Sequence, residues 1–250
     1  MKKMVICATQ RCGSTMLVED MRNSEVLGQP EEWFLSWSGK AVGTDWRQEF
    51  EDVIAKGSGG NSVHAVKVMA NQIFDIDRKL ATAFGERQGG FAPNFFAAYE
   101  DATWISIVRN DFVAQAISRV IARQTNIYHA TGSSESDHFA GNLMRGYKSD
   151  YNAGAEYDFQ AIMKEVFKIQ LENMSWERFF SAHNVIPVRL VYEEISQIEP
   201  DEVVGILVEA SGVQEIPAQT VRKLTKLSNS VNEDFRHRFY QDLYERKFQF

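Results

Sequence analysis

The chain has few of the residues that would place it among metal-binding, disulfide-rich or membrane-spanning proteins. Its 250 residues include two cysteines and five histidines, and no His/Cys/Asp cluster has the spacing of a metal site. Cys7 and Cys12 do not indicate a disulfide framework, and no run approaches the roughly 18–20 apolar residues of a membrane span. The apolar run after Met1-Lys2-Lys3 is too short for a secretory signal. We therefore expect a reducing, cytoplasmic setting without a bound metal.

The sequence also lacks an excess of positive charge. Its formal net charge at pH 7 is −7, whereas non-specific nucleic-acid binders usually carry basic faces. Nucleic acid is therefore not an expected partner, and a polyanionic ligand would require a local concentration of cations. The chain does contain 17 Phe, 8 Tyr and 5 Trp residues, which is typical of a globular protein. No repeat or boundary divides it, so we predict a single domain over residues 1–250.

Short apolar runs alternate with segments of helical periodicity. This alternation predicts an α/β protein with a P-loop-NTPase-like three-layer fold, in which helices cover both faces of a mostly parallel central sheet. Residues 128–157 show little periodicity and predict a long loop, such as a lid or binding segment. The strands are expected at residues 4–8, 63–69, 103–108 and 188–192, and the main helices at 14–21, 45–56, 76–84, 111–121, 159–183 and 200–211.

The stretch from Met4 to Glu19 is typical of an anion-binding site. It combines a buried strand, a glycine-bearing loop over residues 9–13 and a helix that begins at Ser14. The N–H groups of a first helical turn point at the ligand, and the helix dipole favours negative charge there. Ser14 or Thr15 is expected to cap this helix. An ordinary strand–helix turn is the alternative interpretation.

The loop is similar to a Walker A motif but lacks its lysine, because Gly13-Ser14-Thr15 stands where Gly-Lys-Ser/Thr would be. No obvious acidic metal ligand follows a later strand, so hydrolysis of a nucleoside triphosphate is poorly supported. Arg11 supplies a cation two residues before the glycine. Arg109 follows another predicted strand. If the two strands are neighbours, both arginines face one crevice at their carboxyl ends.

Three stretches resemble, in the same order, the bacterial trehalose 2-sulfotransferase family, which uses 3′-phosphoadenosine 5′-phosphosulfate (PAPS). They are residues 9–15, 28–34 (Gly-Gln-Pro-Glu-Glu-Trp-Phe) and 109–118 (Arg-Asn-Asp-Phe-Val-Ala-Gln-Ala-Ile-Ser). Looser similarity extends from about residue 4 to about residue 245. The resemblance implies a PAPS-dependent sulfotransferase acting on a hydroxyl of a carbohydrate or a glycoconjugate such as a glycolipid. It also makes a homodimer an expected assembly.

The resemblance assigns roles to individual residues. Arg109 and Ser118 match the residues that bind the 3′-phosphate, and Arg11 is also expected to act on the transferred group. The 5′-phosphosulfate is expected to be held by Gln10, Arg11, Cys12, Gly13, Ser14 and Thr15.

Glu32 matches the catalytic glutamate of the family. Sulfuryl transfer needs a base that takes the proton of the acceptor hydroxyl, and a carboxylate can fill this role. Glu31 is the rival candidate, because adjacent residues rarely face the same side and at most one of the two is the base. Other sulfotransferases use a histidine, which makes His129 a further alternative.

The chain departs from the family pattern at two positions. Cys12 replaces the usual serine of the loop, and a thiol is a weaker hydrogen-bond donor than a hydroxyl. Gln29 replaces an acidic residue that resembles part of the sugar contact. The resemblance therefore implies sulfuryl transfer without implying trehalose as the acceptor. The polar residues Lys67, Asn71 and Gln72 match a stretch that could contact acceptor or donor.

Two other functions remain as alternatives at this stage. A P-loop-type kinase would bind ATP with magnesium, and the missing loop lysine disfavours it. A non-catalytic nucleotide-binding relative would retain the fold without turnover, and Cys12 in the loop is the one feature that favours it.

Overall fold

The structure is a computed structural model and describes residues 1–132 and 143–245. The chain divides into two compact units, each built from two separate segments. The first unit contains Met1–Asn110 and Glu172–Arg222, and the second contains Asp111–Leu171 and the chain from Lys223 onward. The organisation of residues 1–250 as a single domain stays a prediction.

A four-stranded parallel sheet forms the centre of the first unit. Its strands are ordered β2-β1-β3-β6, and each pairs in parallel with its neighbours. The predicted sheet is therefore confirmed. β1 and β3 are neighbours, which is the arrangement expected if Arg11 and Arg109 face one crevice. Most residues of β1 and β3 and every residue of β2 are buried, which explains their near-continuous apolar runs. The strands are β1 (Lys2–Ala8), β2 (Val63–Met69), β3 (Thr103–Val108) and β6 (Val188–Val191).

Aromatic residues cover one face of this sheet. Val5 and Cys7 of β1 and Val66 and Val68 of β2 pack there against a large cluster that contains Trp37, Phe95, Tyr99, Trp176 and Phe179. Strand alternation explains why every second residue points into it. The cluster comes from η1 (Trp33–Trp37), α2 (Trp46–Gly57), α3 (Ile73–Phe84), α4 (Pro93–Ala98) and the part of α6 (Phe159–Ala182) that belongs to this unit.

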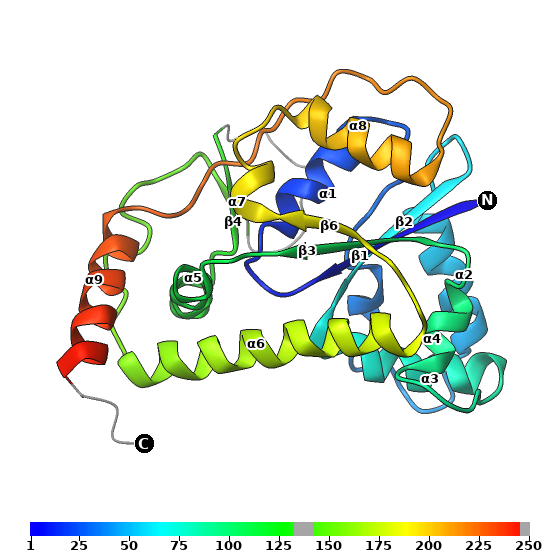
Figure 1. The fold of residues 1–250 in the computed structure, drawn as a ribbon, viewed down its shortest axis with the longest axis horizontal. Coiled ribbons are helices and arrows are strands. Elements are labelled where there is room, and N and C mark those ends of the chain that lie inside the picture. The colour runs from blue at the N-terminus through cyan, green and yellow to red at the C-terminus, as the bar shows by residue number, and fades with distance from the viewer. Residues whose placement is uncertain (133–142, 246–250) are drawn as a thin grey trace. The chain divides into compact units, whose positions relative to one another are not determined.

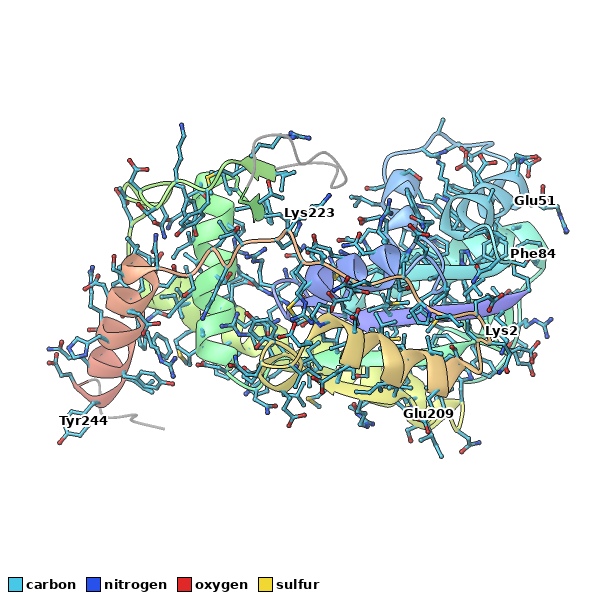
Figure 2. All side chains as sticks on the ribbon, turned by 90° about the horizontal axis from the view of Figure 1, so that it is seen from above. Lys2, Glu51, Phe84, Glu209, Lys223 and Tyr244 are labelled. Carbon is cyan, nitrogen blue, oxygen red and sulfur yellow. The ribbon has the colours of Figure 1, made fainter. Side chains whose placement is uncertain are left out.

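Two helices lie on the opposite face, α1 (Ser14–Asn23) and α8 (Pro200–Ser211) (Figure 1). Each buries a short apolar stripe, such as Leu17 and Met21 of α1. Lys2, labelled in Figure 2, donates a hydrogen bond from Nζ to the carbonyl of Ser211 at 2.8 Å. This contact joins the start of β1 to the end of α8. Helices on both faces confirm the predicted three-layer α/β fold.

The second unit has a separate apolar core. Residues Ile117, Val120, Ile162, Phe235 and Phe239 pack together there. They come from α5 (Phe112–Thr125), the N-terminal part of α6 and α9 (Ser230–Glu245). Two short strands, β4 (His129–Thr131) and β5 (Leu143–Arg145), pair in parallel.

The predicted loop over residues 128–157 therefore contains two three-residue strands within its described part. Residues 133–142 of that segment lie outside the described residues. A lid function for the segment stays a prediction.

Aspartate side chains cap the starts of two predicted helices. Asp45 accepts hydrogen bonds from the N–H groups of Arg47 and Gln48 at the start of α2, and Asp111 accepts one from Ala114 at the start of α5. The cap of α1 differs from the prediction. Its N-cap is Gly13, not Ser14 or Thr15, because the chain enters this helix in a left-handed conformation (φ 93°) that favours glycine.

No helix among residues 1–132 and 143–245 is long and apolar enough to cross a membrane. Within the same residues, no group of three or more His, Cys, Asp and Glu side chains could hold a metal ion.

We predict that the buried His64 makes stability depend on pH. Its Nδ1 lies 3.1 Å from the carbonyl of Ile54 and its Nε2 lies 3.2 Å from the hydroxyl of Tyr99. Burial lowers the pKa of His64 from 6.5 to about 4. Between these values the unfolded chain binds one more proton than the folded protein, so the free energy of unfolding falls as the pH falls. The loss should total on the order of 3 kcal/mol.

The measurement is urea denaturation of the wild type and of His64→Gln at several pH values between 4 and 7. Other groups titrate equally in both proteins, so the difference between the two profiles reports His64. Parallel profiles would show that the buried ring does not contribute.

Candidate functional site

The loop after β1 has the geometry of an anion-binding turn. The N–H of Cys12 donates to the carbonyl of Thr9 at 3.3 Å, and Arg11 (φ 65°) and Gly13 (φ 93°) both have left-handed backbones. α1 begins immediately after the glycine. The N–H groups of Ser14 and its neighbour have no partner within the helix, as is usual for a first turn, and are suited to an anion.

The side chains of this loop differ in exposure. Gln10 is exposed, and Arg11 and Thr15 are partly exposed, so they can reach a ligand. Cys12 and Ser14 are buried. The thiol of Cys12 is therefore shielded, and its N–H already donates within the turn, to the carbonyl of Thr9.

The start of the loop is fixed by a buried tryptophan. Trp176 of α6 donates a hydrogen bond from Nε1 to the carbonyl of Ala8, the last residue of β1, at 3.0 Å. Both cysteines of the chain lie in this region, and both Cys7 and Cys12 are free thiols that are fully or almost fully buried. Burial raises the pKa of the Cys7 thiol.

Tyr192 connects the loop with Arg109. It is the first residue of α7 (Tyr192–Ile195), directly after β6. A Cβ atom added to Gly13 would lie 2.2 Å from Cδ2 of its ring, and the Arg109 guanidinium lies 5.0 Å from the ring centroid. The sequence indicated Arg109 and Gly13 but not this role of Tyr192. The close approach of its ring is a second reason for glycine at position 13, beside the left-handed backbone.

Arg109 leaves the carboxyl end of β3 and is mostly buried, with 16% of its side chain exposed. Its Nε lies 3.9 Å from Oε1 of Glu193, while Oε2 of Glu193 accepts a hydrogen bond from the N–H of Asn110 at 3.1 Å. Among the described residues, Nε of Arg109 is a buried donor without a hydrogen-bond acceptor. Such a donor costs free energy unless a ligand satisfies it.

Glu32 is held at both carboxylate oxygens. Nζ of Lys67 lies 3.2 Å from Oε1, and Nε2 of Gln72 donates to Oε2 at 3.4 Å. Lys67 lies near the carboxyl end of β2, and Gln72 ends the short η2 helix (Ala70–Gln72) that follows. The Glu32 side chain keeps 27% of its surface exposed, so it can contact a ligand while it is held.

Glu31 has a different environment. Its carbonyl accepts a hydrogen bond from the N–H of Lys67 at 2.9 Å, which aligns this segment with β2. Burial raises the pKa of its carboxyl, although Lys67 and Arg22 lower it. Its Oε1 is buried and has no hydrogen-bond partner among the described residues. The two adjacent glutamates therefore differ in environment, and Glu32 is the one held by two side-chain donors.

The remaining predicted residues belong to elements of both units. Ser118 is partly exposed on α5, in the second unit, and its role beside Arg109 stays a prediction. His129 begins β4 in the same unit. Asn71 is exposed after β2. The backbone of Gln29 donates to the carbonyl of Gly57 and its carbonyl accepts from Nε1 of Trp33.

A parallel sheet with a glycine-bearing loop after its first strand and cations near its carboxyl edge is the arrangement in which α/β proteins commonly bind phosphate-type groups. Arg11 and Arg109 follow the neighbouring strands β1 and β3. Comparison with known proteins makes the class specific. The chain belongs to the Stf0 sulphotransferase family, whose model matches residues 3–242.

Two relatives that are similar in sequence agree with this assignment. The chain is 26% identical over 242 residues to a protein of Mycolicibacterium smegmatis named trehalose 2-sulfotransferase, with 83% of each chain covered. It is 25% identical over 225 residues to a protein of the same name from Mycobacterium tuberculosis, covering 75% of this chain and 76% of that one. A sulfotransferase crystal structure from Alicyclobacillus acidocaldarius aligns with a TM-score of 0.45 and 12% identity, covering 97% and 92% of the two chains.

We predict that Gly13→Ala lowers the free energy of unfolding more than Gly39→Ala does. Both glycines have a positive φ, of 93° and 77°, so each substitution introduces backbone strain of about 1 kcal/mol. Only at Gly13 would the new Cβ meet the ring of Tyr192, whereas nothing lies within 4 Å at Gly39.

Urea denaturation of the two variants measures the difference, which should reach about 1–3 kcal/mol because of overpacking. Equal losses of stability would mean that the Tyr192 ring moves away from the loop without cost.

Proposed function

We propose that this protein transfers a sulfuryl group from PAPS to a hydroxyl of a carbohydrate or glycoconjugate. The observation that carries the donor assignment is the buried Nε of Arg109, which has no hydrogen-bond acceptor among the described residues. An arginine fork binds a phosphate through two parallel hydrogen bonds. The 3′-phosphate of the donor would satisfy this group, and the family assignment supports that choice over other phosphates.

The loop would hold the other end of the donor. Backbone N–H groups at the start of α1, from Ser14 and Thr15, would bind the 5′-phosphosulfate. Arg11 is partly exposed beside them and would stabilise the charge that develops on the bridging oxygen and the departing phosphate. Gln10, Cys12 and Gly13 complete the proposed donor site.

Glu32 would act as the general base. In the transfer step, its carboxylate takes the proton of the acceptor hydroxyl as the hydroxyl oxygen forms a bond to sulfur. The bond between sulfur and the bridging oxygen breaks, and 3′-phosphoadenosine 5′-phosphate leaves with the electron pair. The partial exposure of Glu32 and its fixed orientation support this assignment. Glu31 is less suited, because its Oε1 is buried.

A carbohydrate acceptor is proposed because the two relatives described above are named trehalose 2-sulfotransferases. Gln29 lacks the negative charge expected at a sugar contact of those enzymes, so the proposal extends to carbohydrate hydroxyls as a class. Trehalose is the first acceptor to assay, followed by other disaccharides and by glycolipids.

The donor assignment predicts selective stabilisation by 3′-phosphoadenosine 5′-phosphate. A ligand at about 100 times its Kd adds roughly 2.7 kcal/mol to the stability of the folded protein, which a thermal-shift titration detects. The 2′-phosphate isomer and ATP with magnesium should give smaller shifts, and Arg109→Ala should abolish the selectivity.

Arg189→Ala is the matched control, because Arg189 lies in β6 of the same sheet but pairs with Glu177 on an exposed surface, at 2.6 Å. It should keep the full response. Stabilisation by ATP with magnesium instead would favour a kinase, and no response to any nucleotide would contradict the proposal.

The base assignment predicts that Glu32→Gln lowers turnover by about 10²–10⁴-fold, the usual contribution of a general base. The neighbouring Glu31→Gln should lower it by less than about tenfold. Both variants should keep the thermal-shift response to the nucleotide, since the base does not hold the donor.

The assay follows transfer of ³⁵S from labelled PAPS to the acceptor panel. The opposite order of the two variants would move the base to Glu31. Full activity of both would remove this segment from the chemistry.

A further inference from the structure

Lys67 is a buried lysine in the sheet. Only 2% of its side chain is exposed, and every residue of β2 is buried. Lysine is almost never fully buried unless it is paired, because an ammonium group taken out of water loses its hydration. Its position therefore needs a partner that compensates this cost.

That partner is the carboxylate of Glu32, at 3.2 Å from Nζ of Lys67. The second oxygen of the carboxylate accepts from Gln72, whose own Oε1 accepts the N–H of Met69 at 3.1 Å. Two donors from the carboxyl end of β2 and its continuation thus fix Glu32 at both oxygens. A sheet strand and a backbone-anchored amide are rigid supports, so the orientation of the carboxylate is fixed before a ligand binds.

Charge gives Lys67 a second effect. Glu31 and Glu32 are adjacent, and two neighbouring carboxylates disfavour each other's ionisation. Lys67 and Arg22 lower the pKa of Glu31, and Glu32 raises it. Of the two cations, Lys67 also contacts Glu32. A carboxylate beside a cation releases its proton at lower pH than one without it. Lys67 therefore places a positive charge directly against the proposed base.

We propose that Lys67 is a positioning residue for sulfuryl transfer, which orients the Glu32 carboxylate and places a positive charge against it. This inference rests on the proposed role of Glu32 as the base. Lys67 itself forms no bond to the transferred group in this proposal, and Gln72 assists it only in orientation.

The direct test is a titration that needs no acceptor. The ¹³C carboxyl resonance of Glu32, assigned by its absence in Glu32→Gln, is followed by NMR against pH in the wild type and in Lys67→Met. Methionine is close in shape to lysine but uncharged. The titration midpoint of Glu32 should rise by about 1 pH unit or more when the cation is removed.

Lys79→Met is the matched control. Nζ of Lys79 bonds to the carbonyl of Trp37 at 2.9 Å and to Asp75 at 2.5 Å, so its removal takes away a cation elsewhere in the same unit. The midpoint of Glu32 should not change in this variant. An unchanged midpoint in Lys67→Met would overturn the inference.

A reciprocal measurement covers the case in which Lys67→Met does not fold. In Glu32→Gln the lysine is intact but has lost its counter-ion, and a buried ammonium without a partner loses its proton more easily. The Cε resonance of Lys67 should therefore titrate at lower pH in Glu32→Gln than in the wild type. Identical titrations would show that the two groups are not coupled.

Turnover separates this inference from the proposed function. With the acceptor found by the ³⁵S assay, Lys67→Met should lower kcat by about tenfold or more, shift the acid limb of the pH–rate profile upward and leave the KM for PAPS unchanged. In a Glu32→Gln background the same substitution should add less than about threefold, because residues that act as a unit are not additive.

Full activity of Glu32→Gln would contradict the proposed base, while the NMR titrations would still decide whether Lys67 and Glu32 are coupled. If Glu32→Gln lost activity and Lys67→Met did not, the base would stand and the inference on Lys67 would fail. Additive losses would show that Lys67 acts on the reaction independently of Glu32.

Discussion

The close packing of Gly13 against the ring of Tyr192 is the constraint on which the candidate donor site depends. A side chain at position 13 would displace the ring, and the ring also lies under the guanidinium of Arg109. The loop after β1, the helix after β6 and the arginine after β3 therefore form one packed cluster. Their mutual positions follow from the parallel order of β1, β3 and β6, which brings three strand ends to the same edge.

Much of this arrangement could be predicted from the sequence. β2 and β3 were expected at the bounds that the structure has, because strands buried on both faces leave short apolar runs between turn residues. The helix from Pro200 to Ser211 was equally predictable, with proline at its start and glycine in a left-handed conformation after its end. The N-cap of α1 was not predictable in this way. Ser14 and Thr15 have capping side chains, but the backbone conformation required there suits Gly13.

The site was predictable only in part, because its key contacts join residues that are distant in the sequence. The resemblance to sulfotransferases indicated Glu32, but no local pattern showed that Lys67 and Gln72 would hold it. Their contact requires the segment of Glu31 to align with β2, which is a property of the tertiary fold. The roles of Arg11, Arg109 and Ser118, the homodimer, the cytoplasmic location and the lid stay predictions.

The two cysteines give the molecule a built-in reporter of local opening. Cys7 lies in β1 and Cys12 lies in the loop that follows, and the chain has no other thiols. Since both are buried, a thiol reagent can reach them only when this region opens, and local opening has its own free energy. The rate of labelling therefore measures how tightly the loop is closed, without any introduced probe. Occupancy of the loop by an anion would then be visible as protection of a cysteine.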